Sequence, residues 1–164
     1  MRAVANSTIL IALSTIGQLP LLKHRFPQGI LIPEAVWYEV VEAGAGRPGA
    51  TEVRAADWIQ RRRVEDQDYV RLLSTELDVG EAEAIVLARQ ERVDVVLLDE
   101  KEARRVARRL GLRVLGTVGL LIWARRQGLI SSLSAQLRAL QEEGGFRLSQ
   151  ELCLEALRQV GEAG

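Results

Sequence analysis

The sequence predicts a single α/β domain built around a largely parallel sheet. The clearest evidence is the stretch 80–113, in which a helical pattern, the apolar run 95–98 and an arginine-rich helical pattern follow one another. Another short strand is expected at 113–115, and a strand, a helix and a strand joined by short links favour a right-handed parallel crossover. The 164 residues are enough for one domain with a proper core.

Composition indicates an ordinary globular protein and limits the kinds of site it can hold. The chain is 48% hydrophobic and 27% charged, unlike a disordered segment. Its 22 basic and 22 acidic residues cancel, which argues against a globally basic nucleic-acid binder. With Cys153 and His24 as the single cysteine and histidine, cysteine- and histidine-based zinc sites are excluded. A metal would need oxygen ligands, which points to magnesium, manganese or calcium.

The cellular location expected from the sequence is the cytoplasm. One cysteine fits a reducing compartment. The largely apolar stretch 9–22 is interrupted by polar residues and Pro20, and no small-residue cleavage site follows it. No run approaches the roughly 20 apolar residues that a membrane span needs.

The first part of the chain predicts two strands and three helices, followed by a flexible loop. Asn6, Ser7 and Thr8 offer capping side chains to the first helix, and Pro33 suits the first turn of the third. The loop 44–49 contains three glycines. The expected elements are a strand at 2–5, helices at 9–16 and 19–26, a strand at 30–32 and a helix at 34–43.

The rest of the chain predicts a second half of the sheet and a helical end. The basic run 61–63 is typical of a solvated face. From Ser131 onward the pattern is purely helical, which divides the chain into a main domain at 1–130 and a C-terminal extension at 131–164 packed on it. The other expected elements are a helix at 50–56, a strand near 58–59, and helices at 101–110, 118–126, 133–143 and 149–160.

Taken singly, the acidic residues near the predicted strand ends have ordinary explanations. Glu81 follows Asp78 by three residues, as in a capping box. Asp99 could cap the helix that begins near Glu100, and Glu39 could be an exposed helix residue. Asp99 nevertheless comes directly after a buried strand, and ligands of open α/β sheets bind at the carboxyl ends of strands.

Taken together, these residues predict a metal site. Asn6 follows the first strand, Asp99 follows the strand at 95–98, and two helices carry Glu39 and Glu81. If both strands are central and parallel, the four side chains converge at one edge of the sheet. Clustered carboxylates repel one another and are sustained by divalent cations. A cation held there can activate water and stabilise the charge of a phosphodiester under attack.

The order of these segments resembles the PIN-domain family, in particular its VapC-like ribonuclease toxins. Each motif is weak alone, but their order and spacing are specific, and the resemblance covers nearly the whole chain. The segment 116–121 and the trailing helices are similar to one subgroup. The segments that carry the resemblance are 6–13, 32–40, 80–85, and 97–99 with Arg104 and Arg105.

The resemblance implies a three-layer α/β/α fold with a central, mostly parallel sheet of about four to five strands, plus C-terminal helices. It also implies an Mg²⁺- or Mn²⁺-dependent endoribonuclease that hydrolyses RNA phosphodiester bonds and serves as the toxin of a toxin–antitoxin pair. Carried across by position, the metal-binding quartet is Asn6, Glu39, Glu81 and Asp99, of which the three acids are catalytic. Glu83 is the rival to Glu81, although two residues along a helix it points to a different side.

Position 6 departs from the family, which has Asp there. Asn6 keeps one carbonyl oxygen but loses a negative charge in a site whose metal affinity depends on charge. It is also the only Asn in the chain. Two interpretations stay open: weakened but real catalysis, or an inactive PIN-fold module that binds RNA or a protein partner. We favour the nuclease.

The expected partners are RNA, a small antitoxin protein and a second copy of the chain in a homodimer, with no membrane contact. Thr8, Thr117 and Arg104 are the predicted substrate-binding residues, the two hydroxyls orienting water or supporting the ligands and the guanidinium approaching a phosphate. Further basic candidates lie at 61–63 and at Arg105, Arg108 and Arg109. A phosphotransferase with Asp99 as nucleophile is disfavoured, because no Asp-x-Asp pair or glycine-rich phosphate loop accompanies it.

Overall fold

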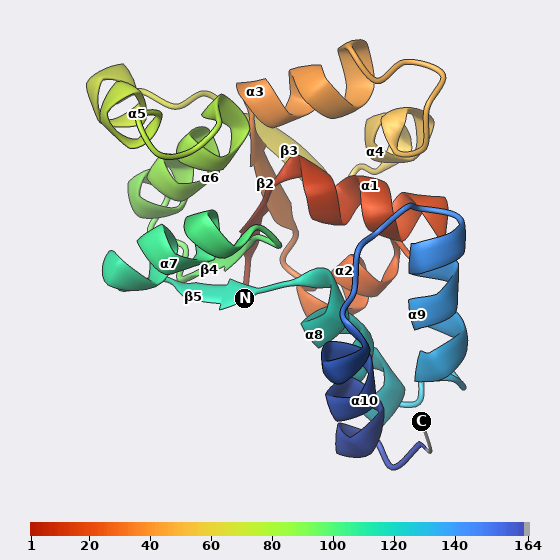
Figure 1. The fold of residues 1–164 in the computed structure, drawn as a ribbon. Helices are drawn as coiled ribbons and strands as arrows, with labels where there is room; N and C mark the ends of the chain where they lie inside the picture. Colours follow the sequence, from red (N-terminus) through yellow and green to blue (C-terminus); the bar gives the residue numbers. More distant parts are fainter. Residues whose placement is uncertain (163–164) are drawn as a thin grey trace.

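The computed structural model describes residues 1–162 and contains a five-stranded, all-parallel sheet with helices on both faces (Figure 1). The strand order is β3-β2-β1-β4-β5, so the first strand is central and pairs with β2 and β4. The predicted α/β/α architecture and strand number are confirmed. The strands are β1 (Ala3–Ala5), β2 (Ile30–Pro33), β3 (Ile59–Arg62), β4 (Val95–Leu97) and β5 (Arg113–Leu115).

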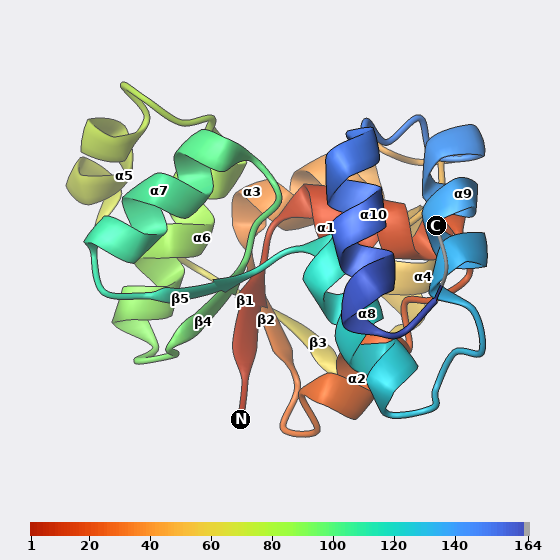
Figure 2. The same cartoon turned by 60° about the horizontal axis from the view of Figure 1, so that its bottom comes forward.

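Alternate strand residues point into two separate cores, which is why the sheet has helices on both sides. Ala3 and Ala5 belong to one core, whereas Val4 between them belongs to the other. The side of Val4 is covered by α5 (Gln67–Leu73), α6 (Val79–Gln90) and α7 (Lys101–Arg109), and the side of Ala3 by α1 (Ser7–Thr15), α2 (Leu21–Arg25) and α8 (Thr117–Arg126) (Figure 2). The helices that follow β1 to β3 are α1 (Ser7–Thr15), α2 (Leu21–Arg25), α3 (Glu34–Trp37), the π-helix η1 (Tyr38–Glu42), α4 (Ala50–Ala55) and α5 (Gln67–Leu73).

Three features of these elements differ from the sequence-based expectation. The predicted helix 34–43 changes from α to π geometry after Trp37. The strand near residue 59 extends to Arg62, so two members of the basic run lie in an edge strand. Helix α5 was not expected, and it forms because Val70 and Leu73 pack into the core while Asp66 caps its first turn.

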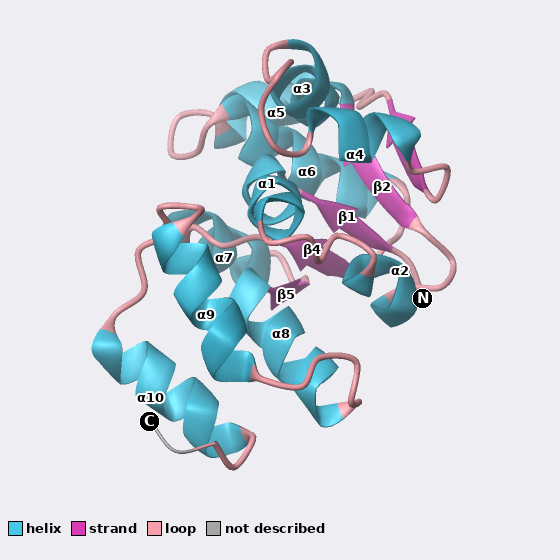
Figure 3. Cartoon of the chain, turned by 90° about the vertical axis from the view of Figure 1, so that its right-hand side faces the viewer, coloured by secondary structure: helices cyan, strands magenta, loops and turns pink. Residues whose placement is uncertain are grey.

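The second half of the chain follows the predicted helices closely. In the predicted extension 131–164, α9 and α10 pack beside α8 and share the core of β1 and α1 (Figure 3). Residues 163–164 of that extension lie outside the described residues. No helix within residues 1–162 is long and apolar enough to cross a membrane. The helices are α6 (Val79–Gln90), α7 (Lys101–Arg109), α8 (Thr117–Arg126), α9 (Leu133–Glu142) and α10 (Gln150–Gln159).

Candidate metal and nuclease site

The candidate site lies at the carboxyl edge of the sheet, where β1 and β4 end side by side. Their register pairs Ala5 with Leu97, and the N–H of Asn6 donates to the carbonyl of Leu97 at 3.1 Å. Asn6 and Asp99 therefore leave adjacent strands at the same edge. Both positions thus lie at one edge of the sheet.

Asn6 and Glu39 meet beside Gly80, at the start of α6. A Cβ placed on Gly80 would lie 2.5 Å from Glu39 Oε1 and 3.3 Å from Asn6 Oδ1. Asn6 is 4% exposed, and neither of these two oxygens accepts a hydrogen bond from another residue in the described part of the chain. The missing side chain at residue 80 thus allows the Glu39 carboxylate and the Asn6 amide to lie directly against the start of α6.

The π-helix η1 positions Glu39 for this meeting. The N–H of Ala43 donates to the carbonyl of Tyr38 at 2.7 Å, five residues back. A Cβ on Gly44 would lie 2.4 Å from the carbonyl oxygen of Val40, so the chain leaves this wide turn through a glycine. Ser7 Oγ donates to Glu39 Oε2 at 2.8 Å and holds the carboxylate toward β1. Short π segments of this kind recur at functional sites.

Glu81 lies next to this pair but is bonded to its own helix cap. Its N–H donates to Asp78 Oδ1 at 2.8 Å, and its Oε1 accepts from the Asp78 N–H at 3.2 Å. This is the capping box expected from the sequence. Burial raises the pKa of Glu81, and the negative charges of Asp78, Glu100 and Glu39 raise it further.

Glu83, the rival ligand, faces a different partner. Its Oε1 accepts a hydrogen bond from the N–H of Ala35 at 3.0 Å, in the first turn of α3. A carboxylate at a helix N-terminus satisfies a backbone donor that would otherwise lack one. Glu83 is therefore a structural residue that fastens α6 to α3.

Asp99 is held by the helix that follows the neighbouring strand. Its two oxygens accept hydrogen bonds from the N–H and the Oγ1 of Thr117, each at 2.7 Å. It therefore caps α8, whereas the possibility that it caps the helix beginning near Glu100 is wrong, since that helix, α7, receives no side-chain cap. The reason is that β5 lies beside β4, which places the start of α8 within reach of Asp99.

Buried surroundings change the electrostatics of Asp99. Burial raises its pKa, and the bonds from Thr117 and the charge of Arg104 only partly offset this effect. A Cβ on Gly116 would lie 2.7 Å from Arg104 Nη1 and 2.9 Å from Asp99 Oδ1. The side chains of Arg104 and Asp99 therefore lie so close to the backbone at residue 116 that only glycine fits there. Arg104 Nη1 also donates to the carbonyl of Leu98 at 2.9 Å.

Comparison with known families agrees with this arrangement. The PIN-domain family model matches residues 2–162, which is nearly the whole chain. The chain belongs to the PIN-domain family. This confirms the family seen in the motifs, and a PIN domain is a nuclease-like fold. No curated protein matches the sequence significantly.

The predicted acids of this PIN domain do not form one tight cluster. Within residues 1–162, no group of three His, Cys, Asp or Glu side chains is close enough to hold a metal ion. Asn6 is an amide and adds no charge to such a group, and Asp99 and Glu81 are bonded to Thr117 and Asp78.

The oxygens beside Gly80 nevertheless fit a divalent cation. Asn6 Oδ1 and Glu39 Oε1 are hard ligands, and Mg²⁺ is commonly bound by one or two protein oxygens while it keeps several waters. Burial is the largest cause that raises the pKa of Glu39, and the charges of Asp78 and Glu83 add to it. A nearby cation would relieve this repulsion.

The predicted substrate-binding residues fall into different environments. Thr8 is half-buried and lines a cavity of about 490 Å³ with Asp99 and Arg147. Arg104 is half-buried beside Asp99. Thr117 is 0% exposed, and its hydroxyl donates to Asp99, so in this structure it supports that acid, and its role toward a substrate stays a prediction.

Most of the other basic candidates are neutralised away from the site. Arg61 pairs with Glu34 at 3.8 Å and lies over the ring of Trp37. The remaining ion pairs of these candidates are Arg62 with Glu91, Arg105 with both Glu102 and Glu76, and Arg109 with Glu76. These contacts agree with the interpretation that the basic residues lie on solvated faces of the protein.

Sequence reasoning missed Ser7 and Gly80 as parts of the site. Ser7 was considered only as a helix cap, and its partner Glu39 is 32 residues away. Gly80 was noted only as part of a motif. A glycine directly before a candidate acid at a helix start was the available signal, since glycine allows another group to approach closely.

The raised pKa of Glu39 makes stability depend on pH. A group whose pKa is raised on folding contributes stability that is present below its ordinary value, here 4.5, and lost as pH rises through the raised value. We expect Glu39→Gln, which can still accept from Ser7, to have a higher urea midpoint than the wild type at pH 7.5 in EDTA, with the difference disappearing at pH 4.5. Glu42→Gln, at an exposed position of η1, is the control. A Glu39→Gln protein less stable than the wild type at pH 7.5 would contradict this account.

Proposed function

We propose that this protein is a divalent-metal-dependent endoribonuclease that hydrolyses phosphodiester bonds of RNA. The observation that carries the proposal is the pair of oxygens from Asn6 and Glu39 beside Gly80. The pair lies at the carboxyl edge of a parallel sheet, where α/β folds bind their ligands. Hard oxygen ligands suit Mg²⁺ or Mn²⁺, and family membership supplies a nuclease-like fold.

The four predicted ligands contribute unequally in this proposal. Asn6 and Glu39 present oxygens without a change of partners. Glu81 would give up one hydrogen bond of 3.2 Å to reach the cation, whereas Asp99 would give up two of 2.7 Å. Glu81 is therefore the third ligand, and Asp99 acts mainly by fixing the edge of the site through Thr117.

A bound cation would supply an activated water and would stabilise charge on the phosphodiester. The chain supplies the remaining functions. Glu81, as the third ligand, would help to hold the cation and to orient its bound water. Arg104, beside Asp99, presents a positive charge to the phosphate.

The second candidate function is a PIN-fold module that binds RNA or a protein partner without cleavage. It is favoured by Asn6 in place of an acid and by the lack of a three-acid group within residues 1–162. The role of toxin and a small antitoxin partner rest on the resemblance to VapC-like toxins and belong to the nuclease proposal. A homodimer belongs to the second function, the binding module.

Cleavage of a fluorescent single-stranded RNA in Mn²⁺ separates the two functions. We expect the wild type to cleave, Asp99→Asn to be slower by about 10- to 100-fold, as for residues that orient a metal site, and Glu39→Gln to be slower still. Glu42→Gln should match the wild type. A wild type that binds RNA but does not cleave it would establish the second function, and an Asp99→Asn protein with full activity would show that the site is misassigned.

Restoring the acid at position 6 tests the proposed metal site directly. Asn6→Asp adds a negative charge beside Glu39, so we expect Mn²⁺ to bind at least about tenfold more tightly by calorimetry. The same variant should be less stable than the wild type in EDTA, because a further buried charge joins a negative cluster. Asn6→Ala is the control and should bind Mn²⁺ more weakly than the wild type. Equal Mn²⁺ affinities in all three proteins would exclude Asn6 as a ligand.

A further inference from the structure

The loop between α9 and α10, residues 143–149, returns from the C-terminal helices to the functional edge of the sheet. Gly144 approaches Thr15 of α1, with a Cβ placed there lying 3.7 Å from its methyl group. The N–H of Phe146 donates to the carbonyl of Leu140 at 3.0 Å, and Gln141 Nε2 donates to the carbonyl of Leu148 at 3.3 Å. The loop is therefore held in place from both of its ends.

This loop forms one wall of two hollows that meet at Asp99. One is the cavity of about 490 Å³ that also includes Thr8. The other has about 450 Å³ and lies between the loop, β5, α8 and α10. Phe146 and Arg147 line both hollows and therefore lie at the boundary between the two.

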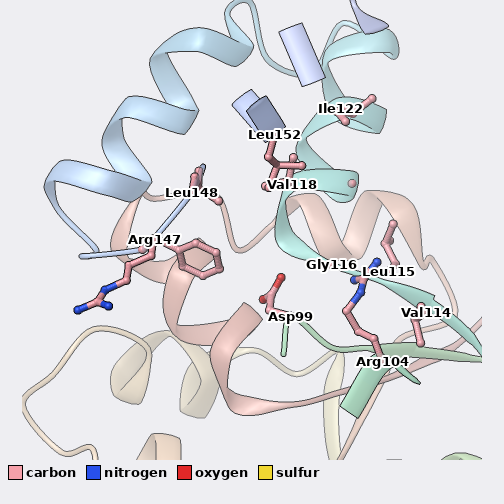
Figure 4. A pocket seen from close by; sticks show the side chains of 12 residues that line it. Asp99, Arg104, Val114, Leu115, Gly116, Val118, Ile122, Arg147, Leu148 and Leu152 are labelled. Carbon is pink, nitrogen blue, oxygen red and sulfur yellow. The ribbon is translucent and has the colours of Figure 1, made fainter. Parts of the chain in front are cut away.

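The second hollow combines apolar walls with a polar mouth. Figure 4 shows Asp99 between Arg104 and Arg147, with Val118 and Leu152 on the facing side. Its volume is within the roughly 300–1,000 Å³ of ligand pockets. The walls are formed by Leu115, Val118, Gly119, Ile122, Leu148 and Leu152.

The charges at the mouth favour an anionic group outside the apolar walls. Arg147 is exposed, its guanidinium points away from Asp99 (Figure 4), and it forms no ion pair within residues 1–162. Arg104 is anchored to the Leu98 carbonyl on the other side. A flat apolar group attached to a phosphate matches this combination, and a nucleotide has both parts.

We propose that this hollow binds one base of a single-stranded RNA next to the bond to be cleaved, with the Phe146 ring as a stacking surface and Arg147 as the contact to the adjoining phosphate. The inference rests on the proposed function and adds a nucleotide subsite built by the C-terminal helices. Aromatic rings stack on bases of any sequence, and guanidinium groups hold the backbone. The subsite therefore confers affinity and register along the strand.

Binding of a fluorescein-labelled single-stranded RNA, measured by anisotropy in EDTA, tests the subsite without cleavage. Phe146→Leu keeps an apolar side chain but loses the ring, and we expect about tenfold weaker binding, with Phe146→Trp restoring it. Arg147→Ala should lower the slope of log affinity against log salt by about 0.7, the value for one phosphate contact on a single strand. Arg147→Lys should keep the wild-type slope.

Arg113→Ala is the matched control, because Arg113 is an exposed arginine at the amino end of β5, away from the functional edge. It should bind RNA like the wild type. Unchanged affinity in Phe146→Leu together with an unchanged salt slope in Arg147→Ala would overturn the subsite, even if the wild type cleaves RNA. If the wild type binds RNA through these two residues but does not cleave it, the proposed subsite is supported and the proposed nuclease function is contradicted. No RNA binding at all would overturn both.

Discussion

The close approach of α6 to η1 at Gly80 is the contact on which the functional edge depends. Because residue 80 has no side chain, the helix start can lie directly against the carboxylate of Glu39 and the amide of Asn6. One turn further along, Glu83 binds the N–H of Ala35 and fastens the same helix to α3. The start of α1, the α3–η1 segment and the start of α6 are distant in sequence. They come together because Gly80 has no side chain and because Glu83 accepts a hydrogen bond from Ala35.

The charge distribution follows from the same geometry. Parallel strands direct their carboxyl ends and the following helix N-termini to a single edge, and α1, α6 and α8 all begin there. Helix N-termini favour negative charge, which offsets part of the cost of burying Glu39, Glu81 and Asp99. The pKa of each of these three acids is still raised, with burial as the largest cause. The acidic groups at this edge are therefore not fully neutralised by the residues of the chain itself.

Sequence patterns predicted the sheet and the position of the site because both depend on local signals. Buried apolar runs followed by Asn6 and Asp99 identify strand ends, and the spacing between them identifies the family. The partners of the acids were not predictable in the same way. Thr117 binds Asp99 across 18 residues, because strand order, which the sequence does not state, places α8 beside it. The π turn that carries Glu39 differs from an α-helix by one hydrogen-bond register, which periodicity over so short a segment does not reveal.

Calorimetry of Mn²⁺ binding to Gly80→Ala examines the proposed cation site beside residue 80. Alanine suits a helix, but its methyl group would lie 2.5 Å from Glu39 Oε1 and would displace that oxygen from its place beside Asn6. We expect the wild type to bind Mn²⁺ and Gly80→Ala, with an unchanged far-ultraviolet circular dichroism spectrum, to bind it at least about tenfold more weakly. Equal Mn²⁺ affinities for the two proteins would contradict a cation site beside Gly80.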